Sequence, residues 1–298
     1  MKTNQIKFKQ TVLSLAVLLI TLVAGCKKDD KKDIVIVPPA DRPVKDVSGN
    51  LIGNILWDKD TVYRLNGVVN VGVDSIQTGT TPQATSVLTI EAGTVIVGKK
   101  GTTGSNPGTL VIHRGSKIYA EGTAANPIIF SSAESSKAPG DWGGLVVCGK
   151  ATNNQPGGFA TLEGSYGGHH GGSDDNDNSG VIKFVRLEYA GYPILTDKEI
   201  NSLTLGSVGS GTTISYVQAS YGLDDAFEWF GGNVNGRNLV AFKTVDDMFD
   251  TDFGFTGNLQ YGLGVSDPNI ADISGSNAFE SDNDAQGTLN VPITNPSF

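Results

Sequence analysis

The same acidic pattern occurs twice in the chain, 22 residues apart, and this spacing limits the folds that the chain can adopt. The stretch DDAFEWFGG covers residues 224–232, and DDMFDTDFG covers residues 246–254. A repeat of roughly 20 to 30 residues is typical of a solenoid, in which each coil stacks on the one before it. Equivalent residues of neighbouring coils then lie about 4.8 Å apart. The repeat therefore predicts a column of carboxylates along a solenoid.

The rest of the chain reads as short strands separated by turn residues. Gly accounts for 39 of 298 residues, and runs such as VLTIEAG (87–93), VIKFVRLEYAG (181–191) and TISYVQAS (213–220) are rich in β-branched and aromatic residues. Asn-Gly and Asp-Gly hairpin signals between these runs are nearly absent, which disfavours a sandwich of tight hairpins. We therefore expect an all-β fold, a right-handed parallel β-helix over residues 48–298. Alternation within the strands predicts five inward-facing residues: Val185, Leu187, Val217, Ala219 and Leu239.

The N-terminus indicates export. Basic residues precede the apolar run VLSLAVLLITLVAG (12–25), which is too short to span a bilayer and has the length of a signal-peptide core. The run ends in small residues before Cys26, a pattern that resembles a bacterial lipobox. We predict a signal peptide over 1–25, a lipidated Cys26 and a charged, Pro-rich tether over 26–47. The sequence CKKDDKKD also resembles the surface-export signal of some outer-membrane lipoproteins, or it is a solvated linker. The predicted location is the outer membrane, exposed at the cell surface.

Charge is distributed unevenly along the chain. Residues 174–284 contain 18 acidic and five basic residues, whereas residues 47–173 contain eight of each. An excess of negative charge argues against nucleic acid or anionic lipid as a ligand of the acidic segment. The negative charge of this segment favours a cation as its partner, or it serves only the solubility of the chain.

Two interpretations of the acidic column stay open. Ca²⁺ takes about six to eight oxygen ligands, and stacked coils can supply carboxylates from fixed positions. Alternatively, Asp and Asn close the corners of the coils because they tolerate left-handed backbone and form Asx-turns. The candidate Ca²⁺ ligands are Asp224, Asp225, Glu228, Asp246, Asp247, Asp250, Asp252, Glu280 and Asp282, with Asp284 near them.

A second acidic stretch, GGHHGGSDDNDNSG (167–180), contains two adjacent histidines. In a strand, His169 and His170 point to opposite faces, which is a poor arrangement for binding one metal ion. The stretch lacks the glycine and the terminal glutamate of an EF-hand loop. A flexible, Gly-rich surface loop is the interpretation we favour.

Four sequence blocks resemble a known family. They are TLVIHRGSKIYAEGTAANPIIFSS, APGDWGGLVVCGKA, DDNDNSGVIKFVRLEYAG and LTLGSVGSGTTISYVQASYGLDDAFEWFGGNVN. They are similar to a family of outer-membrane-associated β-helix lipoproteins whose fold is pectate-lyase-like. The resemblance implies the fold and the location, but it does not by itself imply an activity. The last residues resemble the start of further coils, so we expect the β-helix to be incomplete at residue 298.

Two classes of function follow. Lyase chemistry needs a base and a cation at one uronate, and the pectate-lyase resemblance makes Arg186 and Arg237 candidates for that base. Ser-His-Asp, zinc-protease and phosphate-loop motifs are not found. A non-catalytic surface module would instead bind a glycan or a protein partner, with Ca²⁺ as its only cofactor. The acidic charge of the repeat segment favours this second class, and a Ca²⁺-dependent polysaccharide lyase is the alternative.

Overall fold

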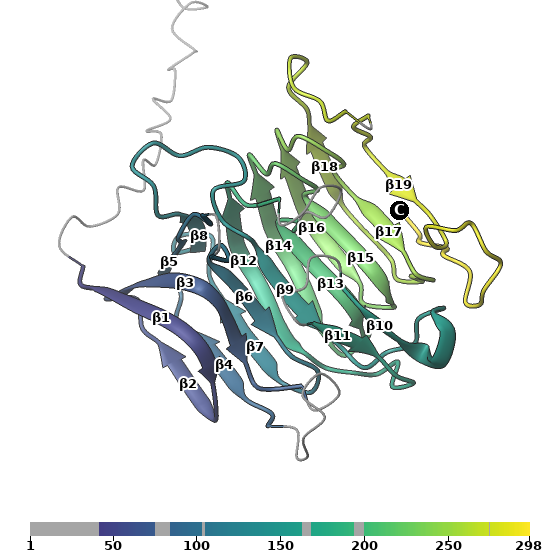
Figure 1. Cartoon of the computed structure of the whole chain (residues 1–298), viewed down its shortest axis with the longest axis horizontal. Coiled ribbons are helices and arrows are strands. Elements are labelled where there is room, and N and C mark those ends of the chain that lie inside the picture. Colours follow the sequence, from purple (N-terminus) through teal and green to yellow (C-terminus); the bar gives the residue numbers. More distant parts are fainter. Residues whose placement is uncertain (1–41, 75–83, 103–104, 163–167, 194–199, 274) are drawn as a thin grey trace, which may run out of the picture. The chain divides into compact units, whose positions relative to one another are not determined.

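Parallel strands stacked coil on coil make up the fold (Figure 1). The computed structural model describes residues 42–74, 84–102, 105–162, 168–193, 200–273 and 275–298. Contacts divide the chain into two units, Met1–Ala40 and Asp41–Phe298, and the described residues all belong to the second. This unit is a right-handed parallel β-helix, which confirms the predicted fold class. The predicted signal peptide, Cys26 and most of the tether lie outside the described residues.

Each coil contributes to three ladders of parallel strands, which we call ladders I, II and III. Ladder I contains β2 (Asn54–Trp57), β4 (Val87–Ile90), β7 (Lys117–Glu121) and the first parts of β12 (Gly180–Glu188), β14 (Thr213–Ser220) and β16 (Gly236–Phe242). Ladder II contains the first parts of β1 (Val44–Leu51) and β3 (Val62–Val71), then β5 (Val95–Gly98), β8 (Ile128–Ser132), the second parts of β12, β14 and β16, and β18 (Gly262–Val265). Ladder III contains the second parts of β1 and β3, then β6 (Thr109–Ile112), β9 (Leu145–Cys148), β13 (Leu203–Val208), β15 (Phe227–Gly232), β17 (Asp250–Asp252) and β19 (Glu280–Ser281).

Two features depart from this regular stacking. The first strand, β1, begins at Val44, inside the segment that the sequence assigns to the end of the tether. A short 3₁₀ helix (Pro156–Gly158) leads into an antiparallel hairpin of β10 (Phe159–Thr161) and β11 (His169–Gly171). Within the described part of the chain, no helix is long and apolar enough to cross a membrane.

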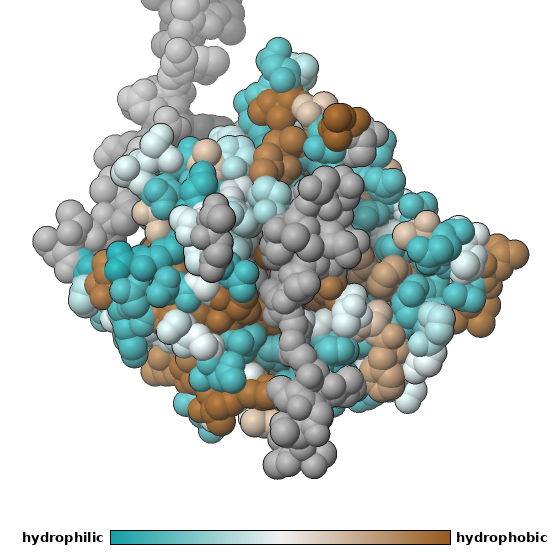
Figure 2. Space-filling model, in the orientation of Figure 1, coloured by the Kyte–Doolittle hydropathy of each residue, from teal (hydrophilic) through white to brown (hydrophobic). Residues whose placement is uncertain are grey.

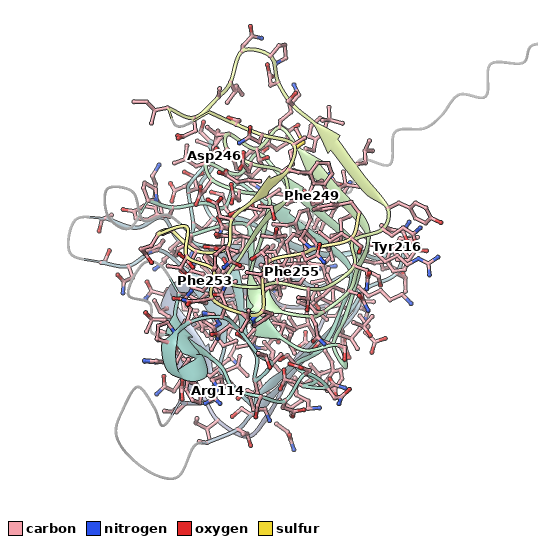
Figure 3. The ribbon with its side chains drawn as sticks, turned by 90° about the vertical axis from the view of Figure 1, so that its right-hand side faces the viewer. Arg114, Tyr216, Asp246, Phe249, Phe253 and Phe255 are labelled. Atoms are coloured by element: carbon pink, nitrogen blue, oxygen red, sulfur yellow. The ribbon has the colours of Figure 1, made fainter. Side chains whose placement is uncertain are left out.

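The core runs along the inside of the coils. Val185, Leu187, Val217, Ala219 and Leu239 are each at most 2% exposed, so the predicted inward faces are confirmed. In the later coils the core is aromatic: the Phe227 and Phe249 rings stack with centroids 5.6 Å apart, and Trp229 packs on Phe255 at the same centroid distance. Figure 3 shows Phe249 and Phe255 within the coils, whereas Tyr216 lies at the outer edge.

A second apolar cluster lies on the outer side of ladder III. It contains Val111, Val146, Cys148, Leu162, Ile200 and Phe230. Leu162 follows strand β10, and His170 of strand β11 is fully buried beside Phe230 and Phe253. The hairpin therefore covers the outer face of ladder III and shields this part of the face from water. The sequence-based interpretation of 167–180 as a surface loop therefore fails for His169–Gly171, which form a strand, and fits residues 173–176, which are exposed and lie outside any strand.

Candidate cation site on the acidic ladder

The strand register places the repeated acids of the sequence on neighbouring coils. Glu228 of β15 pairs with Asp250 of β17, and Asp250 pairs in turn with Glu280 of β19. The first of these steps spans 22 residues, as the sequence repeat predicts. The Asp-Asp pairs at 224–225 and 246–247 lie just before β15 and β17, at the corner where the chain enters ladder III. The repeat is thus a true structural repeat of the solenoid.

Five carboxylates from two coils form one compact cluster. Asp224, Asp225 and Asp246 make a first group of three, in which one carboxylate oxygen of each lies within 4.8 Å of the others. Asp225, Glu228 and Asp250 make a second group with the same property. Because Asp225 belongs to both groups, we call these five residues the carboxylate cluster. Figure 3 labels Asp246 among the side chains of these coils.

Backbone hydrogen bonds explain why acids stand at the corner. The Asp247 N–H donates to Asp225 Oδ1 over 2.9 Å, and the Asn277 N–H donates to Asp247 Oδ1. Each aspartate therefore caps a backbone amide of the next coil. Asn201, one coil earlier, donates from its side-chain amide to Glu228. Turn chemistry, one of the two interpretations left open by the sequence, therefore accounts for one oxygen of Asp225 and one of Asp247.

Burial and mutual repulsion disfavour the charged form of these acids. Burial, followed by the neighbouring charge of Asp224, raises the pKa of Asp225 well above its usual range. Burial and the charge of Asp250 do the same to the pKa of Glu228, and burial raises the pKa of Asp250 to about 6. Without a cation, these acids therefore retain protons at pH values where a free carboxyl group has lost them.

One ligand atom in the cluster has no hydrogen bond. Asp250 Oδ1 is buried and has no hydrogen-bond partner among the described residues. A buried carboxylate oxygen without a donor costs free energy, and a bound cation removes that cost. The chemistry of the cluster, with several carboxylates and neighbouring amide groups, matches the oxygen ligands that Ca²⁺ prefers.

The other predicted ligands lie at the edge of the cluster. Asp247 binds the backbone of the next coil, and Glu280 lies beside it; this contact, with burial, raises the pKa of Glu280 to about 8. Burial raises the pKa of Asp252 to about 7, although Asp252 Oδ1 accepts a hydrogen bond from the Phe253 N–H. Asp282 is exposed. None of these four belongs to either group of three carboxylates in the described residues.

Asp284 has a separate local role. Its carboxylate accepts hydrogen bonds from the backbone N–H groups of Gln286 and Thr288, over 3.0 Å each. The hydrogen bonds from Thr288 hold its pKa below the usual range. Asp284 closes a turn of its own and lies outside the carboxylate cluster.

The two arginines considered as catalytic bases lie on other ladders. Arg186 pairs with Gln218 in ladder II, and Arg237 pairs with Ser215 in ladder I. The carboxylates of Glu228 and Asp250 belong to ladder III. The structure therefore does not bring a candidate base and the candidate cation site to one position.

The two histidines contact different partners. His170 Nδ1 lies 2.8 Å from Ser207 Oγ, and its ring stacks on Phe253 with centroids 6.3 Å apart. Gly206 makes this possible, because a Cβ there would lie 2.6 Å from His170 Cγ. His169 Nδ1 lies 3.8 Å from Asp74 Oδ2. As the sequence predicts, the two rings do not converge on one point.

Sequence reasoning missed the amides of the corner. Asn201 and Asn277 occupy the same corner of the coil as Asp225 and Asp247, through the hydrogen bonds described above. Asn201 precedes Asp225 by 24 residues, so an extension of the 22-residue repeat by two residues would have found it. Asn277 follows Asp247 by 30 residues, and the longer turn between them hides the repeat.

The comparisons with known proteins agree with the geometry. A family model described as a pectate-lyase like beta helix domain matches residues 49–298. No curated protein matches the chain. The matched region spans ladders I, II and III and includes all five residues of the carboxylate cluster. The chain therefore belongs to the family of pectate-lyase-like β-helix domains.

Proposed function

We propose that this chain is a lipid-anchored protein of the cell envelope whose β-helix is a non-catalytic binding or structural module that Ca²⁺ stabilises. The observation that carries the proposal is the carboxylate cluster, in which Asp225 belongs to two groups of three closely spaced carboxylates. Its carboxylates come from two successive coils, at the corner where the chain enters ladder III and on the strands that follow. A cation in the cluster would therefore link one coil to the next.

Ca²⁺ suits this cluster better than other common ions. It accepts irregular shells of about six to eight oxygens, whereas Mg²⁺ requires a near-ideal octahedron and retains several waters. The cluster contains only carboxylates, and it includes no imidazole or thiolate of the kind that Zn²⁺ prefers. Asp224, Asp225, Glu228, Asp246 and Asp250 would hold the ion.

The non-catalytic part of the proposal is supported by the separation of the arginines. A lyase needs its base within hydrogen-bond reach of the carbon acid that the cation polarises. Arg186 and Arg237 lie on ladders II and I, whereas the cluster lies at the entry to ladder III. The alternative, a Ca²⁺-dependent polysaccharide lyase, rests on membership of the pectate-lyase-like family. Incubation with polygalacturonate and Ca²⁺ distinguishes the two, because a lyase forms unsaturated products that absorb ultraviolet light and a binding module does not.

The cation proposal is tested on the full-length protein. After removal of divalent ions with a chelator, Ca²⁺ is titrated by calorimetry, and thermal unfolding is followed with and without the ion. An ion that binds only the folded state adds about 2.7 kcal/mol at a hundredfold excess over Kd. The variant Asp225→Asn with Glu228→Gln should lose the calorimetric signal. The matched control is Asp60→Asn, since Asp60 is a highly exposed acid far from the cluster in sequence.

Two results would contradict the cation proposal. One is a flat calorimetric titration of the wild-type protein with an unchanged melting temperature. The other is a Ca²⁺ response that survives in the double variant.

The anchor is tested separately. The apolar run before Cys26 and the small residues that end it support lipidation at that cysteine. Cys26→Ser should yield a soluble or unprocessed protein, identified by fractionation and mass spectrometry. Acylated, membrane-bound Cys26→Ser protein would contradict the proposal, and this outcome is independent of the calcium result.

A further inference from the structure

One residue of each coil forms the corner between ladders I and II. In four successive coils this residue is aromatic three times, although a small or polar residue is enough for a turn. Phe184, Tyr216 and Asn238 separate the two halves of β12, β14 and β16, and all three have positive φ angles, of 50°, 55° and 55°. The pairing of Leu239 with Gly262 places Tyr261 next in this column. The Leu239 N–H also donates to the Tyr261 carbonyl over 2.9 Å.

The left-handed conformation makes aromatic residues an expensive choice at this corner. Asn and Gly adopt it at little cost, whereas bulky residues there are outliers that cluster at functional sites. Asn238 shows that the ordinary solution also works in this corner. Tyr216 is nevertheless 47% exposed, and Tyr261 is 58% exposed. The cost of a left-handed backbone applies to Tyr216 and not to Tyr261, which has no positive φ angle. Because both rings are about half exposed, burial alone does not explain their presence.

The two exposed tyrosines bound one surface hollow. It has a volume of about 340 Å³, and its lining includes Tyr216, Gln218, Asn238, Val240, Tyr261 and Leu263. Figure 3 shows Tyr216 at the edge of the coils, on the side of the molecule that faces away from the viewer in Figure 2.

The spacing of the coils sets the width of this hollow. Tyr216 and Tyr261 are two coils apart, or about 10 Å between backbones. A ring in contact with both tyrosines needs about 3.5 to 4 Å on each side. On the other side of Tyr216 the equivalent space is filled, because the Phe184 ring stacks on Tyr216 with centroids 4.5 Å apart. Asn238, with its short side chain, leaves room for one ring between the tyrosines.

The lining selects the class of ligand. A pyranose ring has apolar C–H faces and hydroxyl edges, so it suits aromatic side chains beside amide groups such as those of Gln218 and Asn238. Extended peptides are usually recognised through a free sheet edge such as that of β18, the last strand of ladder II in the described residues, whereas this hollow is lined by side chains across three strands. We propose that a sugar ring of a glycan binds between Tyr216 and Tyr261.

The charges around the hollow are compatible with neutral and with acidic sugars. The strands β14, β16 and β18 contain no acidic residue, and Arg237 directly precedes Asn238. Arg186 pairs with Gln218 on the neighbouring coil. The five acids of the carboxylate cluster lie on ladder III or at the corner that leads into it, so the negative charge of the segment 174–284 is not carried by the three strands of the hollow. The glycan site is on a different ladder from the carboxylate cluster and rests on the proposed function only in treating the β-helix as a binding module.

The test is a calorimetric titration of the full-length protein with defined oligosaccharides. The probes are cellohexaose, xylohexaose, mannohexaose and hexagalacturonate, each with and without Ca²⁺. At least one should bind with a Kd below about 1 mM, and Tyr216→Ala and Tyr261→Ala should each weaken that binding about tenfold or more. Asn238→Tyr should also abolish binding, because it fills the hollow and continues the stack. Tyr221→Ala is the matched control, since Tyr221 stacks on Tyr189 at another corner.

Three results would overturn the glycan proposal. The first is that no probe binds with a Kd below about 1 mM. The second is that Asn238→Tyr melts like the wild-type protein and binds the sugar equally well. The third is that only hexagalacturonate binds and the tyrosine variants retain its affinity. The binding would then be a charge attraction that does not involve the two tyrosines. Loss of the Ca²⁺ response leaves the sugar titration in chelator unaffected, so failures of the two proposals are distinguishable.

Discussion

One outward-facing column of ladder III changes its chemistry halfway along the β-helix. The register aligns Asn70, Val111, Val146, Thr204, Glu228, Asp250 and Glu280 as successive members of the column. In the middle coils the members are valines, buried in the outer apolar cluster. In the later coils they are carboxylates. The backbone is the same in both regions, so the side chains reflect what lies over the column.

The difference shows that the residues of an outward face of the β-helix depend on what packs over that face. Over Val111 and Val146, the β10–β11 hairpin and Ile200 exclude water, and apolar side chains are stabilised there. Over Glu228 and Asp250, Asn201 supplies one amide donor, and the acids stay close to one another. The first region is complete without a ligand. In the second region, the raised pKa values of Glu228 and Asp250 show that the charged carboxylates are unfavourable there unless a proton or a cation binds.

The largest effect is expected when the acidic chemistry is moved into the covered region. Val146→Asp places a carboxylate under the hairpin without a cation or a donor, and it should cost about 4 kcal/mol or more of unfolding free energy. Val146→Thr is the control, because Thr204 occupies the next position of the column. It should cost about 1 to 3 kcal/mol, the desolvation cost of one hydroxyl. Chemical denaturation measures both, and a Val146→Asp protein as stable as wild type would show that the hairpin does not seal the column.

A smaller loss is expected when the cover itself is weakened. His170→Ala removes a buried ring that packs on Phe253 and contacts Ser207, and it should cost about 2 to 3 kcal/mol at pH 8. Burial lowers the pKa of His170 to about 3, whereas an unfolded histidine titrates near 6.5. Below about pH 6.5 the unfolded state therefore binds more protons, and the stabilisation by His170 is lost as the pH falls. The difference between wild type and His170→Ala should thus shrink from pH 8 to pH 4. A loss that stays constant with pH would contradict a buried, neutral imidazole.

The acidic region should show the opposite pH dependence when no cation is bound. Burial raises the pKa of Asp250 to about 6 and that of Asp252 to about 7, whereas unfolded aspartates titrate near 4. The folded state then binds more protons, so the contribution of these two acids is fully present below about pH 4 and is lost as the pH rises to about 7. We expect a decrease of several kcal/mol in chelator, at about 1.4 kcal/mol for each unit by which these two pKa values are raised. It is measured on His170→Ala protein to remove the opposing contribution. Saturating Ca²⁺ should abolish or reverse this slope, and an unchanged slope would argue against an ion at the cluster.

Sequence reasoning succeeded where the structure depends on local periodicity. Strand alternation identified inward residues such as Val185 and Leu239, and the 22-residue repeat gave the pairing of Glu228 with Asp250. Both depend only on which residues recur at a fixed spacing. The burial of His170 could not be predicted in this way, because it depends on a hairpin that folds back over coils distant in sequence.

The sequence also could not predict on which face of the β-helix each charged residue lies. Counting acids along residues 174–284 suggested one acidic surface, but each coil divides its residues among three ladders. Glu228 and Asp250 face outward on ladder III, while Arg186 and Arg237 lie on ladders II and I. Net charge along a solenoid therefore says little about any one face.

The smallest effect separates the two roles of the corner acids. Asp225 and Asp247 each accept a backbone N–H of the next coil, but in the described residues only Asp225 belongs to the groups of three carboxylates. An asparagine can accept the same hydrogen bond through its amide oxygen. Asp247→Asn should therefore change the unfolding free energy by less than about 1 kcal/mol and keep the Ca²⁺ response, because the lost charge also relieves the repulsion of Glu280. Asp225→Asn should cost as little in chelator, yet it should lose most of the stabilisation by Ca²⁺. If thermal unfolding in a Ca²⁺ series shows the same response for both variants, the cation does not distinguish the cluster from the turn, and the acids of this corner act only as caps of the coils.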